Sequence, residues 1–157
     1  MIASEKITLC ERGLLGSKKS TILAMGVVGK VSQIEWKFDL ITWADTKDVK
    51  VFDLVQREVI SIIPKQNAEL NAAEIPASFL WNDKKMLIIG WGDFVQICAI
   101  KMRQGSPKIE IQQMFKTEFL IAGLTPIADE LLVMAFEPRS KPSMTPFLEG
   151  SKLLYKI

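Results

Sequence analysis

Few residues in this chain could carry out catalysis, and histidine is not among them, since none occurs in its 157 residues. Its absence excludes Ser-His-Asp and Cys-His nucleophilic catalysis, histidine metal ligands and an imidazole pH switch. The two cysteines, Cys10 and Cys98, can form at most one disulfide and cannot build a zinc cage. Their spacing does not favour a disulfide framework, so a reducing compartment is expected.

The carboxylates offer no better catalytic set. Five aspartates lie where strands are expected to end or turn: Asp45, Asp48, Asp53, Asp83 and Asp93. Aspartate at such positions hydrogen-bonds to its own backbone and favours the turn. No two of them are paired as a general acid and a base, so we interpret them as turn residues. We therefore predict no catalytic residue, no cofactor and no metal ligand, and the residues that bind a partner stay unassigned.

Two glycine-containing segments resemble nucleotide-binding loops only superficially. Gly13–Thr21, GLLGSKKST, has glycines three positions apart and a serine before the first lysine, whereas a phosphate loop needs lysine directly after the second of two glycines five apart. Gly90-Trp91-Gly92 is followed by Val95 where a dinucleotide fingerprint has its third glycine, and no helix is expected after it. We interpret the first as a basic hairpin turn and the second as a tight turn between strands.

The elements that must position these residues are strands. Short apolar runs rich in Val, Ile, Leu, Phe and Trp are separated by Asp, Asn, Lys, Gly and Pro. The expected strands are Lys6–Cys10, Ser20–Met25, Val31–Trp36, Leu40–Trp43, Val49–Leu54, Glu58–Ile62, Ala77–Trp81, Met86–Gly90, Phe94–Lys101, Ile109–Phe115, Phe119–Gly123 and Leu131–Phe136, with Leu153–Ile157 as a further candidate. Gln66–Ala73 is the best helical stretch, but it has almost no large apolar residue, so we expect a loop there.

Length and composition fit one globular domain. Hydrophobic residues make up 48% of the chain, and 20 basic residues stand against 18 acidic ones, for a net charge of +2. This balance gives little reason to expect nucleic acid or an anionic membrane as the main partner. No targeting segment is visible, and the apolar stretch Phe119–Phe136 carries Pro126, Asp129 and Glu130 at its centre, which favours a buried hairpin over a membrane span.

An internal repeat narrows the fold class. Strands spaced by roughly 8–12 residues are typical of a sandwich or a barrel. However, Val31–Ile63 aligns with Ala77–Lys101, and within these copies Leu40–Asp45 aligns with Leu87–Gly92. A third copy begins at Phe119. A period of roughly 45 residues with four short strands per unit is typical of a β-propeller blade.

We therefore predict an all-β chain that forms a partial WD-type β-propeller, with about three blades of four-stranded antiparallel sheet. Propellers close with roughly 4–8 blades, and this length holds fewer. The predicted limits are a partial propeller at 1–137, with a blade end at 1–30, blades at 31–63 and 77–115 and a partial blade at 118–137, followed by a divergent or flexible tail at 138–157.

Two further features of the sequence bear on a binding role. Matching places in two of the copies are occupied by four tryptophans, namely Trp36, Trp43, Trp81 and Trp91. Repetition at the blade period favours packing between blades over a ligand cage. The basic, proline-rich segment Pro138–Pro146 is interpreted as a flexible loop, with a recognition segment or a phosphorylation site beside Arg139 and Lys141 as the alternatives.

Three blocks, in this order and spacing, resemble one family: VGKVSQIEWKFDLITWADTKDVKVFDL, FLWNDKKMLIIGWGDFVQICAIK and QMFKTEFLIAGLTPIADELLVMAF. This family is vacuolar protein sorting-associated protein 41, a subunit of the HOPS tethering complex. The resemblance covers roughly residues 20–137. It implies an amino-terminal WD-type propeller, followed in the family by a long α-solenoid and a RING-like zinc module, for which this sequence has no cysteine cluster.

The resemblance also implies a function. We expect a non-catalytic protein–protein interaction module in vesicle tethering and fusion at the late endosome, lysosome or vacuole. The implied partners are other HOPS subunits and a late-endosomal Rab GTPase, without nucleic acid. Membrane association is expected to be peripheral and through partners only, from the cytoplasmic side. The alternatives are a truncated, non-functional propeller fragment and, less favoured, a propeller-fold enzyme, for which the sequence offers no convergent acids or metal ligands.

Overall fold

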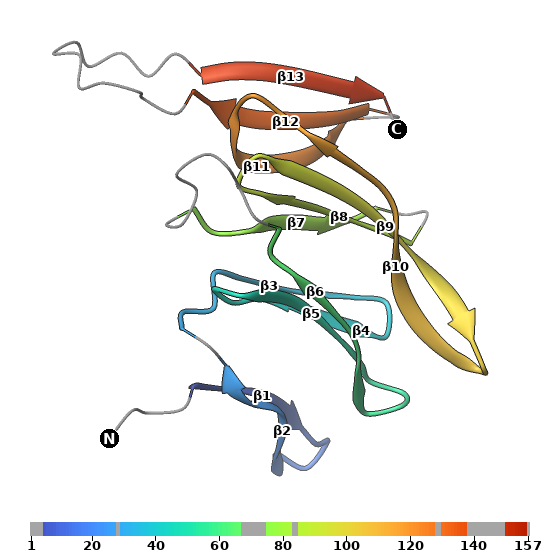
Figure 1. Ribbon diagram of the computed structural model, residues 1–157. Coiled ribbons are helices and arrows are strands. Elements are labelled where there is room, and N and C mark those ends of the chain that lie inside the picture. Colours follow the sequence, from blue (N-terminus) through green and yellow to red (C-terminus); the bar gives the residue numbers. More distant parts are fainter. Residues whose placement is uncertain are drawn as a thin grey trace, which may run out of the picture. The chain divides into compact units, whose positions relative to one another are not determined.

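The computed structural model describes residues 5–27, 29–66, 75–82, 85–127, 130–137 and 150–156, and all regular structure within these ranges is β-strand. The chain divides into two compact units, Met1–Ile63 and Pro64–Ile157. Figure 1 labels the strands, and each unit is described by itself.

The first unit contains a four-stranded sheet in the order β3-β4-β5-β6 (Figure 1). Its strands are β3 (Gln33–Lys37), β4 (Leu40–Ala44), β5 (Asp48–Asp53) and β6 (Glu58–Pro64). Neighbours in the sheet are also neighbours in the chain, so the sheet is a meander with short turns. Strand β4, LITWA, is buried along its whole length, as its uniformly apolar or small residues predict.

A two-stranded hairpin packs on this sheet. Strands β1 (Glu5–Arg12) and β2 (Lys18–Val27) pair antiparallel. Their apolar side chains form one core cluster with those of β4 and β5, and its buried members are Ile7, Val27, Ile41, Trp43 and Phe52. The hairpin therefore covers the part of the sheet face that β4 and β5 provide.

The second unit contains two sheets. The first has the order β10-β9-β8-β7 and the second the order β11-β12-β13. Their strands are β7 (Ser78–Trp81), β8 (Met86–Trp91), β9 (Phe94–Arg103), β10 (Ser106–Lys116), β11 (Leu120–Ile127), β12 (Glu130–Phe136) and β13 (Gly150–Lys156). Figure 1 shows β11 running beside β7 and β8, and a shared core joins the two sheets, with Ile88 and Val95 on one side and Ile121 and Leu131 on the other.

Backbone hydrogen bonds join these two sheets as well. The backbone N–H of Thr117 donates to the carbonyl oxygen of Asp93 at 2.7 Å, while Thr117 Oγ1 donates to the carbonyl of Phe119 at 2.6 Å and lies 3.2 Å from that of Asp93. The N–H of Ile121 donates to the carbonyl of Gly92 at 2.8 Å. The connection from β10 to β11 is therefore attached to the β8–β9 turn, which fixes where the next sheet begins.

The structure confirms the predicted all-β, partial β-propeller architecture. Each expected strand overlaps an observed one, and the two four-stranded meanders have the form of propeller blades. The blade limits drawn from the sequence stay predictions. Strand β13 lies within the segment expected to be a divergent or flexible tail and pairs with β12.

Some expectations lie outside the described residues. They concern residues 67–73 of the expected loop, Asp83, Asp129 at the centre of the expected buried hairpin, and the whole Pro138–Pro146 segment.

The packing of β4 and β8 against neighbouring strands corrects the alignment of the two copies. Ile41 packs with the hairpin that precedes its sheet, whereas Ile88 packs with the strands that follow its sheet. Stacked copies of a repeat turn the same face toward the preceding copy. Ile41 and Ile88 are therefore not equivalent, although the alignment of Leu40–Asp45 with Leu87–Gly92 places them level.

A shift by one residue removes the conflict, because a one-residue slip moves every side chain of a strand to the other face. Aligning residues 40–45 with 88–93 sets LITWAD against IIGWGD. Trp43 is then level with Trp91, and Asp45 is level with Asp93.

Candidate interaction surface

Two aspartates of the first unit, Asp45 and Asp53, act as turn residues, as predicted. Asp45 Oδ1 accepts the backbone N–H groups of Lys47 and Asp48 at 2.9 and 3.0 Å, and its Oδ2 accepts Lys50 Nζ at 2.6 Å. Burial alone would raise the pKa of Asp45, but these hydrogen bonds and the charge of Lys50 lower it below its ordinary value. Asp53 Oδ1 accepts the N–H groups of the β5–β6 turn in the same way. Asp48 also lies 3.2 Å from Lys50 Nζ.

Asp93 differs from its counterpart Asp45. Its side chain is fully buried, and neither carboxylate oxygen accepts a hydrogen bond within the described ranges. Lys116 Nζ lies 3.7 Å from Oδ2, which is an ion pair without hydrogen-bond contact. The backbone carbonyl of Asp93, not its carboxylate, holds the β10–β11 connection.

The two glycine segments form turns. Gly13–Ser17 closes the β1–β2 hairpin through hydrogen bonds from Gly13 N–H to Ser17 and from Gly16 N–H to Gly13. In Gly90-Trp91-Gly92 the turn is shorter than predicted, because Gly90 and Trp91 belong to β8 and only Gly92, at φ 62°, lies in the turn.

Three of the four tryptophans belong to the core, as predicted, and the fourth does not. Trp43, Trp81 and Trp91 are at most 6% exposed, whereas Trp36 is 61% exposed. Trp36 in β3 is paired with Ile41 in β4, and the two side chains lie on the same face of the sheet. The hairpin packs on this face over β4 and β5 but leaves Trp36 exposed. Its Nε1–H donates to the carbonyl of Phe38 at 3.2 Å. The prediction of a core role for Trp36 is therefore wrong.

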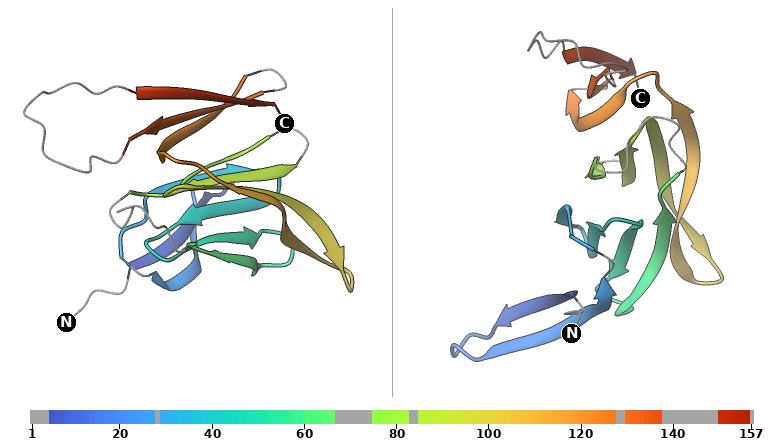
Figure 2. Two further views of the ribbon diagram at one scale, coloured as in Figure 1. Left: turned by 45° about the horizontal axis from the view of Figure 1, so that its top comes forward. Right: turned by 60° about the vertical axis from the view of Figure 1, so that its left-hand side comes forward.

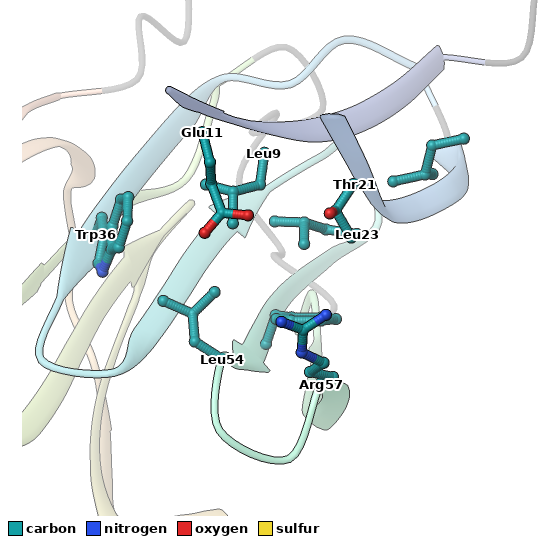
Figure 3. A pocket seen from close by; sticks show the side chains of 9 residues that line it. Leu9, Glu11, Thr21, Leu23, Trp36, Leu54 and Arg57 are labelled. Carbon is teal, nitrogen blue, oxygen red and sulfur yellow. The ribbon is translucent and has the colours of Figure 1, made fainter. Parts of the chain in front are cut away.

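Trp36 forms one wall of a cavity of about 240 Å³ between the hairpin and the sheet. Figure 3 shows Leu9 and Glu11 entering from β1, Thr21 and Leu23 from β2, and Leu54 and Arg57 from the β5–β6 turn. Ile22 and Phe52 complete the lining. The walls are mainly apolar, with one acidic and one basic side chain, and we call this cavity the Trp36 groove.

The Trp36 groove has the size and lining of a site that binds side chains of a partner. Its volume is below the roughly 300–1,000 Å³ of most small-molecule sites, so it would hold one or two side chains of a partner. Tryptophan and arginine are the residue types that carry most energy in protein interfaces. The residues that the structure describes contain no cluster of three or more His, Cys, Asp or Glu side chains that could hold a metal.

Leu9, Glu11 and Arg57 could not be placed together from local sequence, because they come from the hairpin and from a turn more than forty residues later. The feature that could have indicated this site is Trp36 in β3, which lies beside two further exposed apolar residues, Ile34 and Phe38.

Within the described residues, no helix could cross a membrane.

Comparison with known proteins identifies relatives of this chain. The family model Beta-prop_Vps41, described as "Vps42 beta-propeller", matches residues 1–152. The chain is 37% identical over 139 residues to the vacuolar protein sorting-associated protein 41 homolog of Mus musculus and 35% identical over 139 residues to that of Homo sapiens, in both cases over 84% of this chain. For Danio rerio the identity is 35% over 146 residues and 88% of this chain. The chain spans 16–17% of the length of these relatives.

Among solved structures, one chain of a complex from S. cerevisiae is similar in fold. The complex contains a dbp5 variant bound to nup159, a gle1 variant, ip6 and adp. The TM-score is 0.55 at 15% sequence identity, and the match covers 88% of the present chain and 36% of the other. This likeness concerns the strand arrangement alone.

Proposed function

Because this chain belongs to the Vps41 β-propeller family, we propose that it is a non-catalytic interaction module of vacuolar protein sorting. Its finer role is that of a propeller segment in a HOPS-type tethering complex, which acts in vesicle fusion at the late endosome, lysosome or vacuole. The observation that carries the proposal is the family match over residues 1–152, together with 35–37% identity to vacuolar sorting relatives.

The chemistry of the chain supports a binding role. Histidine is absent from the sequence, and the described aspartates with hydrogen-bonded carboxylates serve turns. The exposed Trp36 and the neighbouring Arg57 provide the side-chain types that anchor partners. We propose that a tethering subunit or a GTP-bound Rab-type GTPase is held in part by the Trp36 groove.

Co-precipitation tests this proposal. The tagged full chain is expressed in cells with the tethering subunits, and recovery of those subunits and of a late-endosomal Rab GTPase, loaded with GTP or GDP, is measured. Trp36→Ser should reduce recovery about tenfold or more, since an interface anchor contributes about 2 kcal/mol or more. Met102→Ser is the matched control, because Met102 is 66% exposed and lies outside the groove.

The results distinguish the proposed tethering role of the chain from the proposed use of the Trp36 groove. Recovery of tethering subunits by the chain, lost with Trp36→Ser and kept with Met102→Ser, supports both the role and the groove. Equal recovery with both variants would reject the groove while keeping the role. If neither tethering subunits nor the GTPase are enriched over a chain-free control, the proposed function is wrong.

A further inference from the structure

The tip of the β1–β2 hairpin exposes two leucines to solvent. Leu14 and Leu15 have 108% and 98% of their reference surface exposed, the largest values among the exposed large apolar residues of the described chain. Figure 2 shows this hairpin, drawn in blue, projecting beyond the sheet β3–β6 on which its other end packs. Neither leucine belongs to a core cluster.

The turn itself does not need these leucines. Gly16 N–H donates to the carbonyl of Gly13 at 3.0 Å, and Gly16 has a φ of 78°, which glycine adopts without strain. The central positions of such turns usually carry Asn, Asp, Ser or Pro, since these residues stabilise the turn and are well solvated. Two leucines at this place add exposed apolar surface without adding to the stability of the fold.

Basic side chains surround the leucines. Residues 12–19 contain three basic residues and no acidic one. Arg12 and Lys18 are paired directly across the hairpin, and Lys19, the next residue of β2, is paired with Glu11, one position before the basic stretch. All three are exposed. Apolar residues at a tip, with cations one step behind them, match the layering of a bilayer that has anionic headgroups over hydrocarbon.

We propose that this hairpin tip binds directly to an anionic lipid membrane. Leu14 and Leu15 enter the boundary between headgroups and acyl chains, while Arg12, Lys18 and Lys19 contact the negatively charged headgroups. The inference goes beyond the proposed function and differs from the expectation that membrane contact occurs through partners only. A pocket on a protein partner would accept the leucines equally well, but it would not require cations on both strands of the hairpin behind them.

Vesicle co-flotation tests the proposal on the full chain. The vesicles contain phosphatidylcholine with 30% phosphatidylserine, or phosphatidylcholine alone, at about 0.1 M salt. Binding to the anionic vesicles should fall about fivefold for each of Arg12→Ser, Lys18→Ser and Lys19→Ser, as expected for a cation near a charged membrane surface. Replacing both Leu14 and Leu15 with Ser should lower binding about tenfold or more, because their apolar surface then stays in water.

Matched controls separate the tip from general charge and hydrophobicity. Lys30→Ser and Lys47→Ser remove exposed lysines of the same unit, and Met102→Ser removes an exposed apolar side chain elsewhere. These variants should bind anionic vesicles within about twofold of the unchanged chain. Far-UV circular dichroism establishes that every variant keeps its strand content.

Fluorescence of a dye at the hairpin tip tests whether the tip enters the membrane. In a Cys10→Ser chain, Leu15→Cys carries an environment-sensitive dye, whose emission should rise and shift to the blue with anionic vesicles and not with phosphatidylcholine alone. The proposal is overturned if the chain does not float with anionic vesicles, or if the leucine variant and the controls bind equally. Leucine-dependent retention on a protein partner without any vesicle binding would assign the tip to a protein and also overturn the proposal.

Discussion

Gly90 is the position at which a single added methyl group should destabilise the second unit most clearly. It lies within β8, and a Cβ built on it would be 2.7 Å from Ile121 Cγ2 and 3.2 Å from Leu124 Cδ1. Unstrained carbon atoms pack at about 3.5–4.0 Å, so β11 would have to move by several tenths of an ångström. Because Ile121 is fully buried in the core that joins the two sheets, it has no free space to enter.

We expect Gly90→Ala to lower the free energy of unfolding by about 1–3 kcal/mol, the usual cost of overpacking a core. For a chain of this size the melting temperature should then fall by roughly 3–10 °C. Urea unfolding measures the change directly, and the midpoint should fall while the slope stays constant.

Gly123→Ala is the matched control. Gly123 also lies in a strand of the second unit, but its added Cβ would meet Met134 Cε at 3.5 Å, an ordinary van der Waals distance. This variant should be neutral or slightly stabilising, since alanine restricts the unfolded chain. If Gly90→Ala proves as stable as Gly123→Ala, the close approach of β11 to β8 described above is wrong.

Two further predictions concern titratable groups. Asp45→Asn keeps an acceptor for the turn but loses the charge that pairs with Lys50. Because the pKa of Asp45 is lowered in the folded chain, its charge contributes to stability above about pH 4, and this contribution is lost as the pH falls further. In urea titrations the free energy of unfolding should therefore be larger for the unchanged chain than for the variant at pH 7, and the two values should converge toward pH 2. A stability difference that is unchanged at pH 3 would contradict this account. Burial raises the pKa of Cys98 to about 12, whereas Cys10 is exposed, so a thiol reagent at pH 8 should modify one cysteine of the folded chain and both in denaturant. Rapid modification of a Cys10→Ser chain without denaturant would show that Cys98 is accessible.

Local sequence was sufficient to predict the strands. In LITWA and MLIIGW the apolar residues are interrupted only by Thr42 and Gly90, and an aspartate or a glycine follows each run, so both the extent of the strand and its burial follow from neighbouring residues. The turn role of Asp45 and Asp53 could be predicted for the same reason, because an aspartate accepts hydrogen bonds from backbone groups two and three residues later.

The burial of a side chain that depends on what packs on its sheet could not be predicted in this way. Trp36 and Trp43 share a face of one sheet, yet only Trp43 is covered by the hairpin, and no local pattern indicates where the hairpin ends. The alignment of the two copies from the sequence was wrong by one residue for a related reason. Uniformly apolar strands carry no alternation to mark their faces, so the correct register became visible only from which side Ile41 and Ile88 pack.

The attachment of Thr117 to the Asp93 carbonyl has a consequence for how this fold is assembled during synthesis. The bond spans 24 residues, and the one from Ile121 to Gly92 spans a similar distance, so both close soon after β11 leaves the ribosome. Contacts of such short separation form quickly because little chain entropy is lost in closing the loop. We expect the sheet β11-β12-β13 to be oriented by the β8–β9 turn of the sheet made before it. Within the second unit, a growing chain can therefore add the second sheet to the first as soon as β11 and β12 have been translated.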